Sequence, residues 1–224
     1  MFDSLATSLG LLRLGYSSVV LESADSLRTS GSALGIWANG WRELDAIGVG
    51  HIILAKHTKL SGPLSLEREL VEDPAKVKQL VLSKLGKVSD KIMGVFEETE
   101  LENMVCAPLR FRYPWEMLWG NISRDNICVI GDALHPMTPD MAKGGCSALE
   151  DSVILVRLLA RVLKRNDEGN EQHAITGALE KLARERRWRC FDLISTSYIV
   201  GYIQQNDGVL LQFLRDNFLA SVEV

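Results

Sequence analysis

The stretch NICVIGDALHPMTPDMAKGGCSALEDSVILVRLLARVL, residues 126–163, decides the fold of this chain. It opens with the apolar run 127–130, whose length and β-branched residues are typical of a buried strand. Gly131-Asp132 follows directly, and a glycine-acid pair favours a tight turn over a continuing strand. The sequence therefore predicts a short buried strand that ends in a polar turn.

A loop braced by prolines leads from that turn into a long helix. Pro136 and Pro139 hold the loop extended, and Gly144-Gly145 comes next. We expect the helix to begin near Ser147, because the sequence from there on is apolar on more than one side. The first turn of a helix carries unsatisfied N–H groups and a partial positive charge. The strand, turn, loop and helix start therefore predict a site for an electron-rich or anionic ligand.

Length and composition limit the classes of function. The chain has 224 residues, enough for one large domain, with 46% hydrophobic and 24% charged residues. A net charge of −4 argues against a nucleic-acid partner. The four cysteines are widely spaced, which excludes the usual metal-binding and disulfide patterns. There is no run of transmembrane length and no secretory leader pattern, so we expect a soluble, intracellular protein.

The N-terminal segment has the order of a nucleotide-binding unit. Asp3-Ser4 can cap a helix that ends at Gly15, and residues 18–21 form a short apolar run before Glu22. Helix, glycine, strand and acidic residue make up the later part of a βαβ unit, in which the acidic residue binds the adenosine ribose. A solvent-exposed glutamate is an equally good interpretation of Glu22 from these residues alone.

The remaining segments are predicted mainly as helices. We expect a helix over 41–47, helical stripes within 67–100, and strands over 33–37 and 103–113. Three further helices are expected at the C-terminal end, over 176–189, 190–204 and 209–219. The basic cluster 184–189 favours a solvated helix face rather than a phosphate-binding patch, because Glu185 interrupts it.

The motif GDALHPMTPD…GGCSALED resembles the second flavin-contacting motif of the FAD-dependent aromatic hydroxylases. It is most similar to plant-type monooxygenases related to zeaxanthin epoxidase and urate hydroxylase. The resemblance implies an α/β fold, a partial Rossmann-like FAD-binding fold with a helical C-terminal region. In that family the aspartate of the GD pair binds the ribityl chain, the loop passes the isoalloxazine ring, and the helix points toward the flavin N1–C2=O edge.

Carried over to this chain, the resemblance places the FAD contacts on Gly131, Asp132, Pro139, Gly144, Gly145 and, at the adenosine ribose, Glu22. It also implies an arginine near the pyrophosphate, for which Arg42 and Arg28 are candidates, with a surface role the alternative for each. No metal ligands and no catalytic side chain are indicated, since in such proteins the cofactor carries the chemistry.

One departure from the family lies inside the motif. Relatives usually read G-Q-G-G where this chain has Ala142-Lys143-Gly144-Gly145. If the first position needs a positive φ, Ala142 costs about 1 kcal/mol.

Three polar residues near the motif have structural interpretations. For His135 we favour a hydrogen bond to the backbone over a role in proton transfer. Glu150-Asp151 is expected in the first helical turn, where negative charge interacts favourably with the helix dipole.

The resemblance also predicts how the chain divides into parts. We expect a remnant of the βαβ region over 1–62, a remnant linking to the substrate domain over 63–120, and the GD part with the C-terminal helices over 121–224. The glycine fingerprint and the middle segment of the family are not in the printed sequence, so we interpret the chain as a shortened form.

The function implied is an FAD-dependent monooxygenase that uses NAD(P)H to insert one oxygen atom of O2 into a small organic substrate. A non-catalytic binding protein derived from the flavin fold and a flavin-linked reductase are the alternatives. The sequence does not indicate an oligomeric state.

Overall fold

The computed structural model describes residues 2–23, 35–55, 74–84, 90–101, 110–164, 170–206 and 208–219. Two compact units are distinguished, residues 1–60 with 111–224, and residues 61–110. The expected three-part division at 62 and 120 stays a prediction. None of the described helices is both long enough and apolar enough to cross a membrane.

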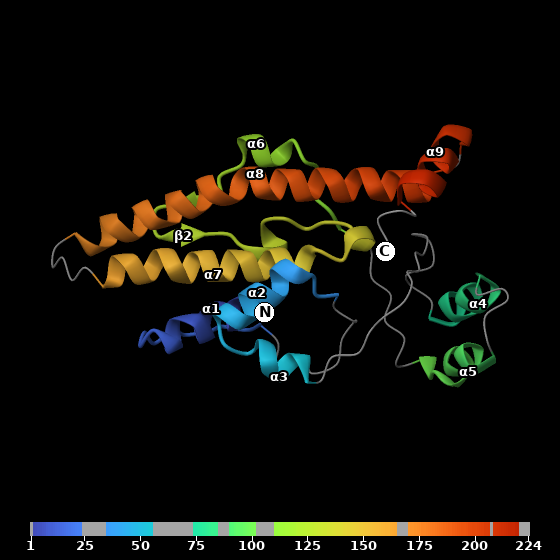
Figure 1. The fold of residues 1–224 in the computed structure, drawn as a ribbon, viewed down its shortest axis with the longest axis horizontal. Helices are drawn as coiled ribbons and strands as arrows, with labels where there is room; N and C mark the ends of the chain where they lie inside the picture. The colour runs from blue at the N-terminus through green and yellow to red at the C-terminus, as the bar shows by residue number, and fades with distance from the viewer. Residues whose placement is uncertain are drawn as a thin grey trace. The chain divides into compact units, whose positions relative to one another are not determined.

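The first unit is built on helices (Figure 1). They are α1 (Phe2–Arg13), α2 (Ala38–Ala46), α3 (Gly50–Leu54), α6 (Glu116–Trp119), α7 (Gly144–Leu163), α8 (Glu171–Gln205) and α9 (Val209–Leu214). The strands are β1 (Ser123–Arg124) and β2 (Ile127–Cys128), the 3-10 turns are η3 (Gly131–Ala133) and η4 (Pro139–Met141), and a π turn, η5, spans Arg215–Leu219.

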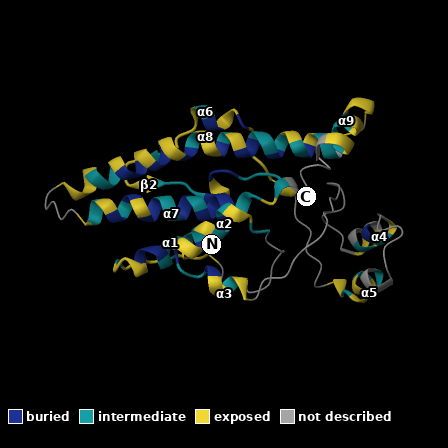
Figure 2. Ribbon diagram, in the orientation of Figure 1, coloured by how far each residue is buried: buried dark blue, intermediate teal, exposed yellow. Residues whose placement is uncertain are grey.

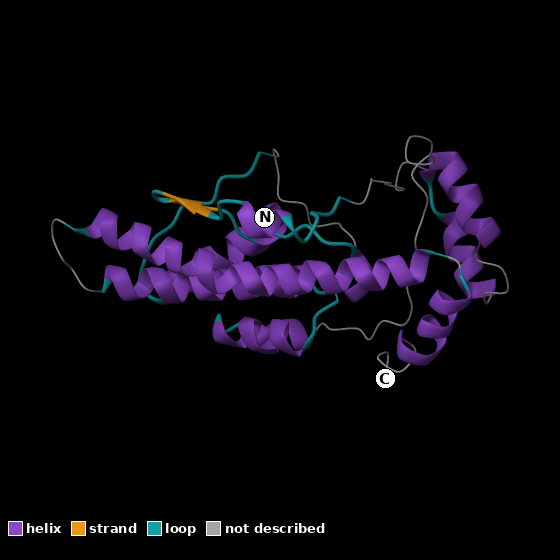
Figure 3. Ribbon diagram, turned by 90° about the horizontal axis from the view of Figure 1, so that it is seen from above, coloured by secondary structure: helices purple, strands orange, loops and turns teal. Residues whose placement is uncertain are grey.

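Helix α7 is the centre of this unit, with α8 on one side and α1 and α2 on the other (Figure 1). Figure 3 shows that the described chain is mainly helix with one small sheet. The sequence of α7 is apolar around much of its circumference, so it can be covered from both sides. One core cluster joins α7 to α8 through Leu155, Leu158, Ala178, Leu179 and Leu182. Another joins α7 to α1 and α2 through Ala6, Leu44, Ile47 and Leu149. Figure 2 shows the buried surface concentrated along α7, which confirms the expected internal helix.

The sheet is much smaller than the sequence predicts. Residues 127–130 are expected to form a buried strand, but only Ile127–Cys128 is a strand, paired antiparallel with β1. The two strands are joined by a tight turn in which Asp125 has a φ of 52°. The side chain of Ile127 is 72% exposed, so this strand is not buried. A buried strand needs neighbours on both edges, and the described residues supply one short antiparallel partner.

The expected strand at residues 18–21 is also wrong. These residues belong to no strand, and Val19 and Leu21 are 85% and 90% exposed. Of the strands expected over 33–37 and 103–113, residues 33–34 and 103–109 lie outside the described residues, and the rest are not strands. The described part is therefore mainly helical with one two-stranded sheet, and it bears out the expected α/β fold only in part.

The helices agree with the predictions from sequence better than the strands do. Helix α1 ends before Gly15, whose φ of 88° suits a glycine after a helix. Helix α2 begins at Ala38, three residues earlier than expected. The two helices expected over 176–189 and 190–204 are one continuous helix, because residues 178–200 contain no glycine or proline that would end a helix.

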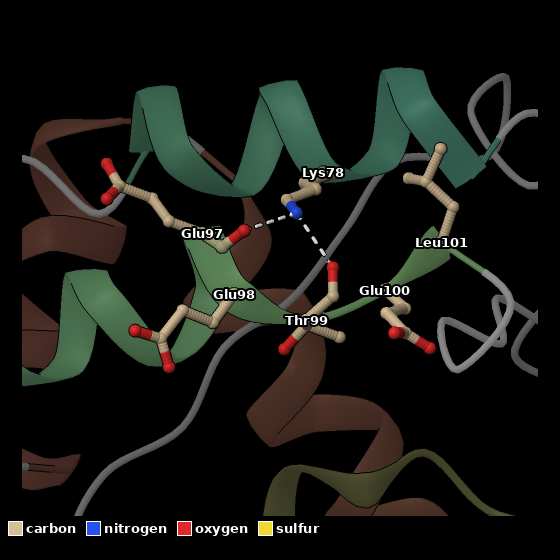
Figure 4. Close-up of a pocket in the computed structure, with 6 residues that line it drawn as sticks. All are labelled: Lys78, Glu97, Glu98, Thr99, Glu100 and Leu101. Atoms are coloured by element: carbon tan, nitrogen blue, oxygen red, sulfur yellow. Dashed lines mark hydrogen bonds between the residues drawn. The ribbon is translucent and has the colours of Figure 1, made fainter.

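In the second unit, the helices are α4 (Pro74–Lys84) and α5 (Asp90–Glu98). The Lys78 ammonium donates to the carbonyls of Glu97 and Thr99, both at 2.7 Å, beside a hollow of about 670 Å³ (Figure 4). A cation on the last carbonyls of a helix satisfies them and interacts favourably with its dipole. We therefore interpret Lys78 as a cap for the C-terminal end of α5.

Candidate functional site

The site begins at the turn between β2 and α7. Gly131 is buried and has a φ of 61°, a conformation that side chains rarely adopt. A Cβ atom there would lie 2.5 Å from Asp3 Oδ2 on α1. The position therefore needs glycine for both its backbone angle and its space, which explains the first residue of the GD pair.

Asp132 lies beside the start of α7, although the whole proline loop separates the two in sequence. Its side chain is exposed, and a Cβ atom on Gly144 would lie 3.9 Å from Asp132 Oδ1 and 3.8 Å from Met137 Cγ. Lys143 stands at the N-cap of α7 and makes no side-chain hydrogen bond to the cap. The structure thus brings the Asp132 carboxylate to the first residue of the helix.

Helix α7 begins at Gly144, so its earliest amides belong to the two glycines and to Cys146. The first N–H groups of a helix have no partner within it, and this helix has no acidic residue in its first turn. A carboxylate that accepts hydrogen bonds and amides that donate them therefore lie side by side, and we call Asp132 with Gly144 and Gly145 the candidate ligand site. This arrangement suits a ligand that has both hydroxyl groups and an electron-rich edge.

The expected position of Glu150-Asp151 in the first turn is wrong. The helix starts three residues before Ser147, which moves both acids into its second turn. Two glycines in succession do not delay the helix, because glycine is free to adopt helical angles as well as others.

The loop before α7 is strained at one residue. Ala142 has a φ of 48° and a ψ of 30°, the left-handed conformation. The position therefore does need a positive φ, which costs an alanine about 1 kcal/mol. Pro139 occupies the first position of η4 and is exposed.

Trp37 ties this loop to the segment before α2. Its indole N–H donates to the carbonyl of Met141 at 3.0 Å, and Lys143 Nζ lies 5.2 Å from the centre of its ring. Its backbone N–H donates to Cys146 Sγ at 3.2 Å. The loop is thus held from a segment 104 residues away in sequence.

A buried carboxylate lies directly beneath the turn. Asp151 Oδ2 accepts from the Gly131 N–H at 2.8 Å and lies 2.7 Å from His135 Nε2. Its other oxygen, Oδ1, accepts from Arg186 Nε. His135 and Asp151 are 0% exposed. His135 therefore contacts a carboxylate rather than the backbone partner that the sequence favours.

Arg186 links this carboxylate to a second one. Its Nη1 donates to Glu150 Oε2 at 2.8 Å and its Nη2 to Ser147 Oγ at 2.9 Å. Glu150 also accepts from Asn39 Nδ2 at 2.7 Å. Burial alone would raise the pKa of Glu150, but hydrogen bonds from Arg189, Asn39 and Arg186 outweigh it and hold that pKa below its usual value.

The sequence reasoning missed this network because it assigned residues 184–189 to a solvated face. Arg186 is only 3% exposed, so the prediction of a solvated face is wrong for the arginine that binds both carboxylates. A usable signal was present: Glu150 and Asp151 interrupt an otherwise apolar helix, and buried charges need partners of opposite sign.

The same cluster contains three groups of the kinds that bind metals. Donor atoms of His135, Asp151 and Cys190 lie within 4.8 Å of one another. Burial raises the pKa of the Cys190 thiol to about 12, and the Arg186 guanidinium already occupies one oxygen of Asp151. A neutral thiol and an adjacent fixed cation do not suit a divalent ion. We interpret the cluster as structural.

Comparison with known proteins agrees with the motif. Residues 111–176 match the FAD binding domain family. The chain is 50% identical over 153 residues to Monooxygenase 2 of Arabidopsis thaliana. The aligned region covers 65% of this chain and 38% of that protein.

This sequence is related to FAD-dependent monooxygenases.

Further relatives support that statement. Monooxygenase 1 of Arabidopsis thaliana is 34% identical over 119 residues, covering 51% of this chain and 30% of the relative. The chloroplastic zeaxanthin epoxidase of an Oncidium hybrid cultivar is 29% identical over 112 residues, covering 50% of this chain and 16% of the relative. The chain thus spans well under half the length of each of these relatives. No solved structure matches it.

The segment that matches the FAD binding domain holds the turn, the proline loop and α7, but neither Glu22 nor Arg42. Glu22 lies in the irregular segment after α1 and Arg42 on α2, both with exposed side chains. Arg28 lies outside the described residues. The structure therefore gathers Gly131, Asp132 and the start of α7, while Glu22 and Arg42 lie on separate segments.

Proposed function

We propose that this chain binds FAD at the candidate ligand site, where Asp132 lies beside the start of α7, and that it serves a monooxygenase reaction. The observation that carries the proposal is the position of the exposed Asp132 carboxylate beside the uncapped first residues of α7. Ribityl hydroxyls would donate to the carboxylate, and the flavin N1–C2=O edge would accept from the helix amides.

The residues of the candidate ligand site fit such a ligand. Gly144 has no side chain, and a Cβ atom there would come into contact with Met137 and Asp132. The glycine therefore keeps free the space between the carboxylate and the helix start. When bound, FAD supplies the redox chemistry that joins NAD(P)H oxidation to insertion of one oxygen atom of O2 into an organic molecule.

The protein's own residues would bind and orient the cofactor. Asp132 accepts hydrogen bonds, the amides of Gly144 and Gly145 donate them, and Pro139 with its loop borders the ring. Trp37 keeps that loop in place through Met141. Glu22 at the adenosine ribose and Arg42 at the pyrophosphate are the secondary contacts of this proposal.

The test is to add FAD to the purified 224-residue chain, remove free cofactor and measure retained flavin absorbance, NAD(P)H oxidation and oxygen uptake. We expect flavin to be retained and NAD(P)H to drive oxygen uptake when a substrate is present. No retained flavin at micromolar protein would reject the proposal. Retained flavin without reduction would favour the non-catalytic binding protein, and reduction without oxygen insertion the flavin-linked reductase.

A further inference from the structure

We propose that Asp151 is a positioning residue that fixes the Gly131-Asp132 turn on α7 and thereby sets the place of the Asp132 carboxylate. The inference rests on the proposed function, because it concerns how the flavin-binding carboxylate is held. Asp151 itself is fully buried and would act only through the turn.

The contacts of Asp151 fix the turn at both ends. One oxygen accepts from the Gly131 N–H at 2.8 Å and lies 2.7 Å from His135 Nε2. The Gly131 carbonyl accepts in turn from the amides of Leu134 and His135, each at 2.9 Å. Asp132 lies between these two attachment points. Its backbone therefore cannot shift relative to α7 while the carboxylate of Asp151 keeps both contacts.

Helix α7 fixes the distance between the turn and the candidate ligand site. Asp151 and Gly144 both belong to α7, and the two turns between them span roughly 10 Å along a regular helix. Because the helix is rigid over two turns, a turn fastened at Asp151 is held at a set place above Gly144. The proximity of Asp132 Oδ1 to Gly144 is the result.

Arg186 holds the second oxygen of Asp151 from α8. With both oxygens engaged, the carboxylate has no freedom to rotate. Arg186 is fixed in turn by Glu150 and by Ser147, both on α7. Hydrogen bonds to charged groups in a buried site are stronger than those between neutral groups. The support for the turn therefore comes from a network whose central pair, Asp151 and Arg186, is buried.

The decisive experiment compares FAD affinity in four full-length forms: wild type, Asp151→Asn, Asp132→Ala and the double variant. Asp151→Asn keeps the shape of the side chain but places an NH2 group against the donors. We expect it to weaken FAD binding roughly tenfold in the wild-type background and by far less when the Asp132 carboxylate is already absent, since residues that act together are coupled. An equal loss in both backgrounds, or no loss, overturns the proposal.

A matched control separates positioning from general destabilisation. Ile47→Ala removes a buried side chain from the core cluster that joins α1, α2 and α7, and no residue of 127–137 is among the described members of that cluster. We expect it to lower the unfolding midpoint while the dissociation constant for FAD changes less than about twofold.

Amide hydrogen exchange tests the same claim without FAD. We expect the Gly131 amide to exchange faster in Asp151→Asn, while the amide of Ile47, which donates to the Glu43 carbonyl, keeps its protection. Unchanged exchange at Gly131 would overturn the inference even if the cofactor data agreed. Wild-type chain that binds no FAD would reject the proposed function, and the exchange result would still decide whether Asp151 holds the turn.

Discussion

Arg186 and Asp151 form an ion pair whose side chains are 3% and 0% exposed. Removing one partner of such a pair leaves a buried charge without compensation, which costs about 3–5 kcal/mol. We therefore expect Asp151→Ala to lower the free energy of unfolding by about that amount in urea denaturation. Arg157→Ala, which removes a partly exposed pair with Glu185, should cost less than about 1 kcal/mol. Similar losses in the two variants would contradict the importance of the buried pair.

Ala142 is expected to be a site of stabilisation. Because its φ is 48°, Ala142→Gly should relieve strain and raise the free energy of unfolding by about 1 kcal/mol. Ala174→Gly, within helix α8, should lower it by up to about 1 kcal/mol. A loss of stability in Ala142→Gly would show that the left-handed conformation is not strained.

Glu150 should make stability depend on pH in acid. Its pKa in the folded protein lies below the ordinary value of 4.5, because hydrogen bonds outweigh burial. Its contribution is therefore complete above pH 4.5 and is lost as the pH falls through the lowered pKa. In urea unfolding across this range, the stability difference between wild type and Glu150→Gln should shrink as the pH falls. A difference that is constant with pH would contradict this.

Glu43 should make stability depend on pH in the opposite direction to Glu150. Burial and the Glu150 charge raise its pKa above 4.5, so its ionised form is disfavoured in the folded protein. The resulting penalty appears as the pH rises above 4.5. Glu43→Gln should therefore be more stable than wild type at neutral pH, and the gain should vanish in acid. No gain at neutral pH would contradict the assignment.

Cys190 should resist alkylation in the native protein. It is 0% exposed, and burial raises the pKa of its thiol to about 12, so almost no thiolate forms near neutral pH. Among the cysteines that the structure describes, Cys128 is the partly exposed one. Mass spectrometry after brief iodoacetamide treatment should find Cys128 modified well before Cys190. Faster modification of Cys190 would show that the core opens locally.

Features set by neighbours in sequence could be predicted well. Apolar spacing gave α1 and α2 to within a few residues, and the internal character of α7 followed from its composition. The cap expected at Asp3-Ser4 was wrong, because α1 begins at Phe2 and contains both residues. Strain at Ala142 was expected on the condition that the position has a positive φ, and the structure shows that φ. These signals are local, so a single sequence contains them.

Features set by distant partners could not be predicted in the same way. A strand exists only with a neighbour to pair with, and the exposed Val19 and Leu21 have the composition of a strand without the pairing. The contact between Asp151 and Arg186 spans 35 residues of sequence, and Arg186 lies in a cluster whose other members suggest a solvated surface. Spacing along one helix cannot indicate which face of a second helix will cover it.

The most direct test of the flavin site is the FAD dissociation constant of wild type, Asp132→Ala and Glu22→Ala, followed by flavin fluorescence. Hydrogen bonds to a charged group contribute about 1.5–3 kcal/mol. We therefore predict that Asp132→Ala weakens FAD binding by about tenfold or more, and that Glu22→Ala weakens it less. Equal affinity of wild type and Asp132→Ala would contradict the account.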